Sequence, residues 1–153
     1  MTAITVSSPE DLGDAVGKTA TGPWRVIDQD RVNLFADATD DHQWIHVDPA
    51  RAATESPFGG PVAHGFLTLA LVPALTDGLL DVGGTAMVVN YGLDRVRFLQ
   101  PVLAGSRVRA TTVVDSTEPT AQGVRVSSTV TVEIEGAPRP ALVAQTIALY
   151  VPA

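Results

Sequence analysis

The second half of the chain alternates apolar and polar residues with the period of two that is typical of β-strands. The alternation is clearest over 124–134, where one series of positions is mostly apolar: Val124, Val126, Ser128, Val130, Val132 and Ile134. The segments 107–116 and 142–151 alternate in the same way, and 87–99 does so less regularly. Turn-forming residues separate the segments: Gln100-Pro101, Gly105-Ser106, Glu118-Pro119 and 136–140. The pattern predicts a run of antiparallel strands.

Helical spacing marks two segments of the first half. A helix is predicted over 28–38, with Asp28 as its N-cap. Its apolar positions recur at i, i+3, i+4 and i+7: Val32, Phe35, Ala36 and Thr39. The second helix is predicted over 66–80, which is apolar on nearly every face and therefore expected to be buried. Pro73 predicts a kink in its middle, and Gly83-Gly84 end the segment.

A polar segment, 39–65, connects the two predicted helices. It is rich in Asp, His, Pro and Gly, and only 48–53 suggests a helical turn. Ordered loops of this length are uncommon in compact domains and tend to be functional. One buried helix followed by antiparallel strands predicts a single α+β domain over 1–153, with the sheet wrapped around the helix. The free edges of such a sheet favour a homodimer.

The composition narrows the possible functions. The chain has 153 residues, 45% hydrophobic and 18% charged, as in ordinary globular proteins. It has no cysteine, which excludes disulfides, thiolate metal sites and a cysteine nucleophile. The net charge of −7 argues against a nucleic-acid partner. Without a signal peptide or a membrane-spanning apolar stretch, we expect a soluble, cytoplasmic protein with no membrane partner.

Four arginines lie close together in the sequence: Arg95, Arg97, Arg107 and Arg109. A local basic patch can bind an anionic ligand even on an acidic protein. Alternation on strands also produces such side chains on a solvent-facing surface. Both interpretations stay open at this point.

The polar segment contains a candidate acid–base pair, Asp41 and His46, just past the end of the first predicted helix. A loop can bring two such side chains together on one small molecule, here a water. Histidine exchanges protons near neutral pH, and a neighbouring carboxylate can orient and polarise the same proton. The spacing alone is not specific, because polar loops contain many such pairs.

A glycine-rich run leads from this segment into the apolar helix. Gly65 lies near the helix N-terminus, where backbone N–H groups lack partners and can hold a carbonyl oxygen that gains negative charge. Alternatively, Gly59, Gly60 and Gly65 only permit tight turns. His64 is either a third chemical group or, as is more common beside a buried helix, a structural residue.

Metal binding was weighed for His42 and His46, which would share one face of a helix. Trp44 between them and Asp48-Pro49 after them favour loop backbone, and the Glu of the HExxH motif is missing. We therefore expect no metal.

The run from Asp40 to His46, Asp-Asp-His-Gln-Trp-Ile-His, resembles the hydratase motif of the MaoC-like dehydratase family. That family includes the R-specific enoyl-CoA hydratases and has the hotdog fold. Its usual motif reads Gly-Asp-x-Asn-Pro-(Ile/Leu)-His, so Asp40, Gln43 and Trp44 are departures that look most like the nodulation-protein-N branch. The segments 47–53, 58–69 and 96–102 also match. The resemblance covers nearly the whole chain from about residue 28.

The resemblance implies a lyase of fatty acid metabolism that reversibly hydrates trans-2-enoyl-CoA or acyl-carrier thioesters to (R)-3-hydroxyacyl thioesters. It assigns the catalytic Asp to Asp41, the catalytic His to His46 and the carbonyl-binding N–H to Gly65. No cofactor is implied, since coenzyme A is part of the substrate. A supporting Ser of some members falls on Pro73, so that contact is absent. The remaining site residues are assigned to substrate binding: His64, Gly60 and Trp44.

Two other functions were considered. Hotdog proteins include acyl-CoA thioesterases, which commonly use a lone carboxylate on a helix instead of a loop Asp–His pair. They also include non-catalytic acyl-binding subunits. Retention of Asp41 and His46 argues against such a subunit, although Trp44 could narrow the pocket.

Overall fold

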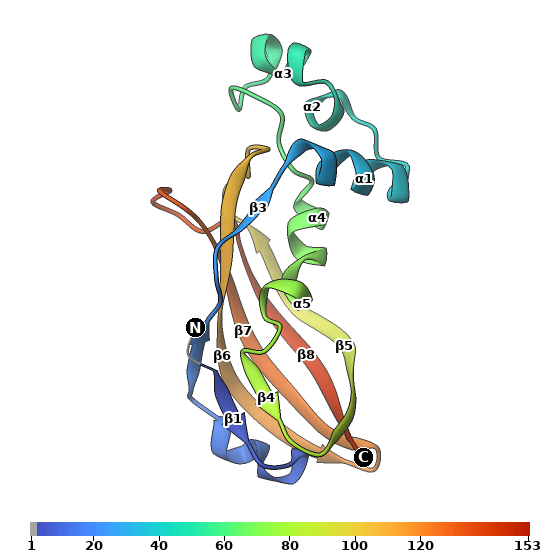
Figure 1. The fold of residues 1–153 in the computed structure, drawn as a ribbon, viewed down its shortest axis with the longest axis vertical. Helices are drawn as coiled ribbons and strands as arrows, with labels where there is room; N and C mark the ends of the chain where they lie inside the picture. The colour runs from blue at the N-terminus through green and yellow to red at the C-terminus, as the bar shows by residue number, and fades with distance from the viewer. Residues whose placement is uncertain (1–2) are drawn as a thin grey trace.

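The computed structural model describes residues 3–153, in which one long antiparallel sheet curves around short helices (Figure 1). The four long strands are β5 (Thr85–Phe98), β6 (Ser106–Thr120), β7 (Gly123–Ile134) and β8 (Leu142–Pro152). Two short strands, β2 (Thr19–Thr21) and β3 (Arg25–Ile27), complete this sheet. The sheet order is β2-β6-β7-β8-β5, and β3 also pairs with β6. All four strands predicted from alternation are confirmed, and the α+β fold class with them.

Three short strands near the N-terminus and one near the middle of the chain were not predicted: β1 (Ile4–Val6), β2 (Thr19–Thr21), β3 (Arg25–Ile27) and β4 (Leu80–Val82). Each has three residues, too few to show a period of two. The turn predicted at Glu118-Pro119 is wrong, because both residues belong to β6. The hairpin reverses before Gly123, whose backbone approaches the Tyr150 carbonyl so closely that a Cβ would clash with it.

The first predicted helix is confirmed as α1 (Gln29–Thr39), with Asp28 as its N-cap. An Asp28 side-chain oxygen accepts the Arg31 N–H at 2.9 Å. The predicted turn at 48–53 is part of α3 (Pro49–Glu55). The polar segment also contains α2 (Trp44–Val47), which is a single helical turn and was expected to be loop.

The second predicted helix differs from expectation. It consists of α4 (Gly65–Ala70) and α5 (Val72–Leu75), and it ends five residues early. Pro73 lies in the first turn of α5, where its missing N–H costs no hydrogen bond, so the chain restarts a helix there instead of kinking one. The helices are also not buried on all sides by this chain, since Phe66 is 69% exposed.

The core divides into two apolar clusters along the sheet. The first surrounds α4 and α5 and includes Val108, Ala110, Val130 and Ala144. The second lies towards the other end and includes Leu12, Leu79, Val114 and Val126, with Leu12 supplied by the 3₁₀ helix η1 (Pro9–Ala15). No helix within residues 3–153 is long and apolar enough to cross a membrane.

Candidate active site

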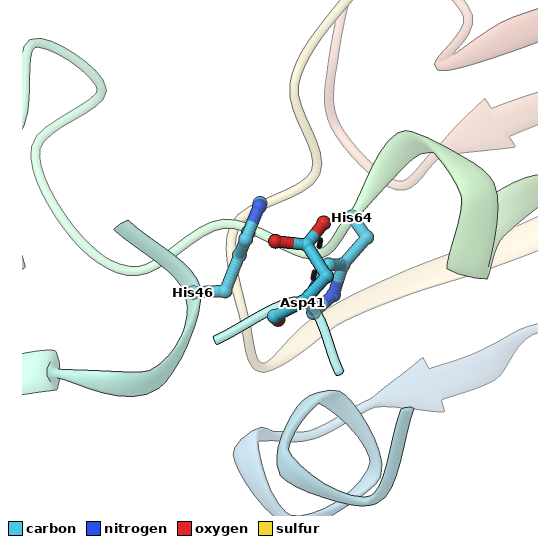
Figure 2. Close-up of side chains that lie close together, drawn as sticks. All are labelled: Asp41, His46 and His64. Atoms are coloured by element: carbon cyan, nitrogen blue, oxygen red, sulfur yellow. Dashed lines mark hydrogen bonds and ion pairs between the residues drawn. The ribbon is translucent and has the colours of Figure 1, made fainter. Parts of the chain in front are cut away.

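Asp41, His46 and His64 converge where the polar segment meets α4 (Figure 2). Asp41 follows the end of α1, His46 lies in α2, and His64 directly precedes α4. One ring nitrogen of each histidine and a carboxylate oxygen of Asp41 lie within 4.8 Å of one another. Three segments of the chain therefore place a carboxylate and two imidazoles around one point.

A left-handed turn residue brings Asp41 into this cluster. Asp40, directly after α1, has φ 57° and ψ 23°, and it is the one non-glycine residue within 3–153 with a positive φ. This conformation explains why the family motif has glycine here, since glycine adopts it without a steric penalty. Aspartate tolerates it better than most residues.

Replacing Asp40 by glycine is therefore expected to raise the free energy of unfolding by up to about 1 kcal/mol, because the steric cost of the left-handed conformation disappears. Thermal and urea unfolding would measure the change. The matched control is Gly17→Ala, which introduces a side chain at φ 81° and should lower stability. A loss of stability in Asp40→Gly would contradict the claim that the left-handed conformation of Asp40 carries a steric cost.

The protonation of His46 is set by a main-chain contact. Its Nδ1 lies 2.6 Å from the Val62 carbonyl oxygen. Because a carbonyl only accepts hydrogen bonds, Nδ1 carries the proton, and in the neutral ring Nε2 has a free lone pair. Nε2 is therefore the nitrogen that can accept a proton from a bound molecule.

Burial keeps His46 neutral. The residue is only 8% exposed, and desolvation is the main cause that lowers its pKa below the ordinary value. The hydrogen bond to Val62 opposes this effect, the nearby His64 lowers the pKa further, and Asp41 raises it. The net result is a histidine in its basic, unprotonated form around neutral pH.

His64 packs between the catalytic candidates and the core. It is 3% exposed, and its ring stacks on His46 with centroids 3.8 Å apart and 23° between the planes. Its Nε2 donates to the Asp41 main-chain oxygen at 2.9 Å. His64 thus fixes the backbone of Asp41 and one face of His46. This geometry suits a positioning residue, and its assignment to substrate binding stays a prediction.

The Asp41 carboxylate and His46 do not hydrogen-bond to each other directly in the described part of the chain. The gap of up to 4.8 Å is the distance that a single water spans with two hydrogen bonds of about 2.8 Å. The carboxylate is half-exposed, while the imidazole is buried, so such a water would be held at the boundary of the interior. The pair can therefore hold and polarise one water.

Gly65 supplies a backbone N–H directly after His64 in the chain. It begins α4, and its N–H makes no hydrogen bond within residues 3–153. A Cβ at Gly65 would lie 3.1 Å from the Phe98 ring, so only glycine fits without a shift. Because α4 has six residues, the helix dipole is weaker than a long helix would supply, and the local N–H is the main donor.

An apolar cavity of about 390 Å³ opens at Gly65. Its walls include Ile45 and Val62, which flank His46, as well as Phe98 and the buried Thr68. The carbonyl end of an acyl ligand in this cavity would be within reach of the Gly65 N–H.

The other two predicted substrate-binding residues lie apart from the cluster. The Trp44 ring is covered by the Arg51 guanidinium, 4.2 Å from its centroid. Gly60 is buried against Leu103. Neither lines the cavities found in the described chain, so their roles stay predictions.

A metal site at His42 and His46 does not form, because the His42 ring turns to Asp37 at 2.8 Å. Asp41, His46 and His64 do offer metal-binding atoms. However, ligands of a tetrahedral zinc at about 2.1 Å lie closer together than the upper spread of this cluster.

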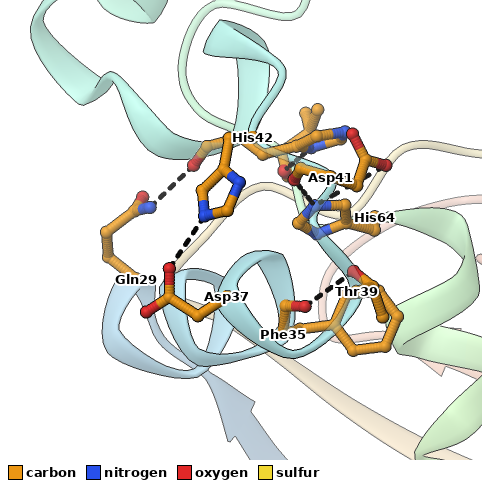
Figure 3. A network of polar contacts seen from close by, with 9 residues as sticks. Gln29, Phe35, Asp37, Thr39, Asp41, His42 and His64 are labelled. Carbon is orange, nitrogen blue, oxygen red and sulfur yellow. Dashed lines mark hydrogen bonds and ion pairs between the residues drawn. The ribbon is translucent and has the colours of Figure 1, made fainter.

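Two residues of α1, Gln29 and Phe35, support the site in a way that the sequence did not predict (Figure 3). The Gln29 amide donates to the His46 main-chain oxygen at 2.7 Å and to Asn33 at 2.9 Å. The Phe35 ring packs on His64 with centroids 4.9 Å apart. Only the helical spacing pointed to Phe35, and no sequence signal marked Gln29.

The arginines are distributed over the outer face of the sheet. Arg107 pairs with Glu135 at 2.8 Å, and Arg109 pairs with Glu133 at 2.6 Å. These two support the interpretation of solvent-facing strand positions. Arg95 and Arg97 lie on β5 and form no ion pair within residues 3–153.

Known structures resemble this arrangement of a curved sheet, a helix pair and a polar segment. The unliganded R-hydratase from Pseudomonas aeruginosa superposes with a TM-score of 0.77 at 25% identity, covering 95% of this chain and 86% of that one. The (R)-hydratase from A. caviae superposes with a TM-score of 0.73, also at 25% identity, over 88% of this chain and 96% of that one. The protein is thus of the hotdog fold.

Sequence comparison then gives the family. The family model described as MaoC like domain matches residues 11–135. 3-Hydroxyacyl-thioester dehydratase Z of Mycobacterium tuberculosis (strain ATCC 25618 / H37Rv) is 51% identical over 149 residues, which cover 96% of this chain and 98% of that protein. Nodulation protein N of Rhizobium leguminosarum bv. viciae is 49% identical over 143 residues, 92% of this chain and 87% of that protein. The chain belongs to the MaoC-like dehydratase family, as its motifs suggested.

Proposed function

We propose that the protein adds water across the double bond of trans-2-enoyl thioesters to give (R)-3-hydroxyacyl thioesters, and catalyses the reverse dehydration. One observation carries the proposal: a ring nitrogen of the neutral, buried His46 and an Asp41 carboxylate oxygen lie within 4.8 Å of each other, and the Nδ1–H···O bond to Val62 leaves Nε2 of His46 as the proton acceptor. Relatives named as a 3-hydroxyacyl-thioester dehydratase and as R-hydratases support it.

In this mechanism the water lies between Asp41 and His46. His46 Nε2 takes a proton from the water as its oxygen attacks C3 of the enoyl group, and Asp41 orients the water and stabilises the imidazolium. The electron pair of the double bond moves towards the thioester oxygen, where the Gly65 N–H stabilises the developing charge. The catalytic pair then returns a proton to C2. Atoms balance without a metal or a redox cofactor.

Crotonyl-CoA provides the direct test. Loss of the conjugated double bond without release of free thiol, with an (R)-3-hydroxy product, is the expected result. Thiol release would instead support an acyl-CoA thioesterase. Neither change, in a folded protein that still binds the ligand, would support a non-catalytic acyl-binding subunit.

The pH profile should report the buried histidine. Because burial lowers the pKa of His46, the unprotonated base persists below pH 6.5, the ordinary histidine value. We therefore expect the acid limb of kcat/KM to lie below pH 6.5, with activity falling as His46 becomes protonated. An acid limb above pH 6.5 that His46→Asn leaves unchanged would contradict this assignment.

We also propose a cytoplasmic homodimer that pairs through β5, the free edge of the main sheet. Large apolar side chains on this strand are exposed: Met87, Val88, Val89, Tyr91 and Leu93. A long, apolar, unpaired edge strand is a template for pairing with a second copy.

Val89→Lys is expected to weaken self-association about tenfold or more, the equivalent of roughly 1.4 kcal/mol. Light scattering after size-exclusion chromatography over a concentration series would measure it. Val16→Lys, at an exposed apolar residue away from β5, is the matched control. A wild-type protein that stays monomeric at high concentration would contradict the proposal.

A further inference from the structure

A second and larger cavity, of about 610 Å³, is lined by residues of α4, α5 and the long strands of the sheet. Leu69, Ala70 and Pro73 form its helical wall, so it follows the Gly65 cavity along the helices. Its helical wall begins at Leu69, four residues after Gly65 on the same helix α4, which is roughly 6 Å along the helix axis. A ligand held by its carbonyl at Gly65 could therefore extend the distal part of its chain into this cavity.

Three hydroxyl side chains cross the floor of this cavity: Thr112 on β6, Ser128 on β7 and Thr146 on β8. Ser128 is directly opposite Thr146, and it is opposite Val114, two residues from Thr112. The three therefore form a row across neighbouring strands on the inner face, which we call the hydroxyl row.

The hydroxyl row separates the two apolar clusters of the core. On one side of the row lie residues of the first cluster: Ala110, Val130 and Ala144. On the other side lie Val114 and Val126 of the second cluster. The inward-facing neighbours of Thr112 on β6 and of Ser128 on β7 are thus all apolar. The polar residues occur where these strands line the cavity.

The Thr112 and Ser128 hydroxyl groups are buried, but they remain free to hydrogen-bond to a ligand. Thr112 is 6% exposed and Ser128 is 8% exposed. Neither hydroxyl makes a hydrogen bond within residues 3–153, and both oxygens keep some accessible surface. Thr146 donates weakly to the Ser128 main-chain oxygen at 3.3 Å and keeps its acceptor capacity. The Tyr150 phenol also lines the cavity, and burial raises its pKa, so it is a neutral hydrogen-bonding group.

We propose that the hydroxyl row binds an oxygen-bearing group, such as a hydroxyl, on the distal part of the substrate's acyl chain. The inference rests on the proposed hydration of enoyl thioesters and names the substrate class. A purely hydrocarbon chain in this cavity would displace water from the hydroxyl row and leave its groups unpaired, which costs free energy. An oxygenated chain replaces those hydrogen bonds, so the site discriminates in its favour.

The test compares substrates of equal length on the wild-type enzyme. The probes are trans-2-octenoyl-, decenoyl- and dodecenoyl-CoA, each paired with its ω-hydroxy counterpart, so that the oxygen is placed at three depths. For at least one pair we expect kcat/KM to be about tenfold higher for the ω-hydroxy substrate, the effect of one hydrogen bond to an otherwise unpaired group. A ratio of one or below in all three pairs would overturn the proposal.

Variants then assign the effect to the hydroxyl row. Thr112→Val and Ser128→Ala remove one hydroxyl each with little change of shape, and each should move the ratio towards one. Because both substrates are measured on the same variant, a general loss of activity cancels. Ser128→Ala, the smaller change, decides the outcome if Thr112→Val does not fold. Thr131→Val is the matched control, since Thr131 lies on the opposite face of β7.

The outcomes are distinguishable from failure of the proposed function. If wild-type enzyme hydrates none of the substrates, including crotonyl-CoA, the proposed function fails. If it hydrates them with equal kcat/KM, only the hydroxyl row proposal fails, and the row binds water alone. If both variants keep the preference for ω-hydroxy substrates, the substrate oxygen is recognised elsewhere, and the proposal for the hydroxyl row is overturned.

Discussion

Asp41→Asn is expected to lower kcat for hydration of crotonyl-CoA by about 10²–10⁴-fold, the usual contribution of a positioned acid–base group. Asparagine keeps the shape and can still hydrogen-bond to water, but its neutral amide cannot stabilise an imidazolium at His46. The effect should fall on kcat more than on KM, because the carboxylate acts on the reacting water instead of holding the thioester. Steady-state kinetics from the loss of enoyl absorbance would measure both.

The structure also predicts that Asp41→Asn folds normally. The side chain is half-exposed, and the Asp41 contact that holds the loop uses its main-chain oxygen, which the substitution leaves in place. Asp37→Asn is the matched control, an exposed acid of α1 whose partner is His42. An Asp41→Asn enzyme with more than a tenth of wild-type kcat would show that this carboxylate is not catalytic.

His46→Asn is expected to have an equally large effect, a loss of about 10²–10⁴-fold in kcat. The asparagine amide can replace Nδ1–H as the donor to the Val62 carbonyl, so the loop geometry is retained. No atom of asparagine replaces Nε2, so the proton acceptor is lost. Loss of the stacking on His64 should cost about 1 kcal/mol of stability, which thermal unfolding would detect.

His42→Asn is the control for this variant, since His42 is exposed and its one side-chain hydrogen bond within residues 3–153 is to Asp37. It should retain near wild-type kcat. The double variant Asp41→Asn/His46→Asn should lose little more activity than either single variant, because both groups act on one water. Fully additive losses would indicate that the two residues act in separate steps.

The periodic segments were predictable because one face of each strand is buried. Burial of alternate residues on β6, β7 and β8 imposes a period of two that survives in the sequence. The helix α1 was predictable for the same reason, together with its Asp28 cap. Three-residue strands and the single turn of α2 carry no such signal, since their conformation depends on partners far away in the sequence.

The error at 66–80 shows a limit of hydrophobicity as a signal. An apolar segment must be covered, but the sequence does not say by what, and it was assigned to one helix buried within its own chain. In the structure the segment becomes α4, α5, a turn and β4, and Phe66 remains exposed.

The sequence by itself determined the types of chemical group in the proposed site: a carboxylate, an imidazole and a glycine N–H, in the order the family motif requires. It also determined the sheet. Only the tertiary structure decided which nitrogen of His46 is free, because that depends on the Val62 carbonyl from another segment. It alone brought His64 into contact with both Asp41 and His46. It also turned an apparent member of an apolar series, Ser128, into part of a hydroxyl row, since only strand register places Thr112 and Thr146 beside it.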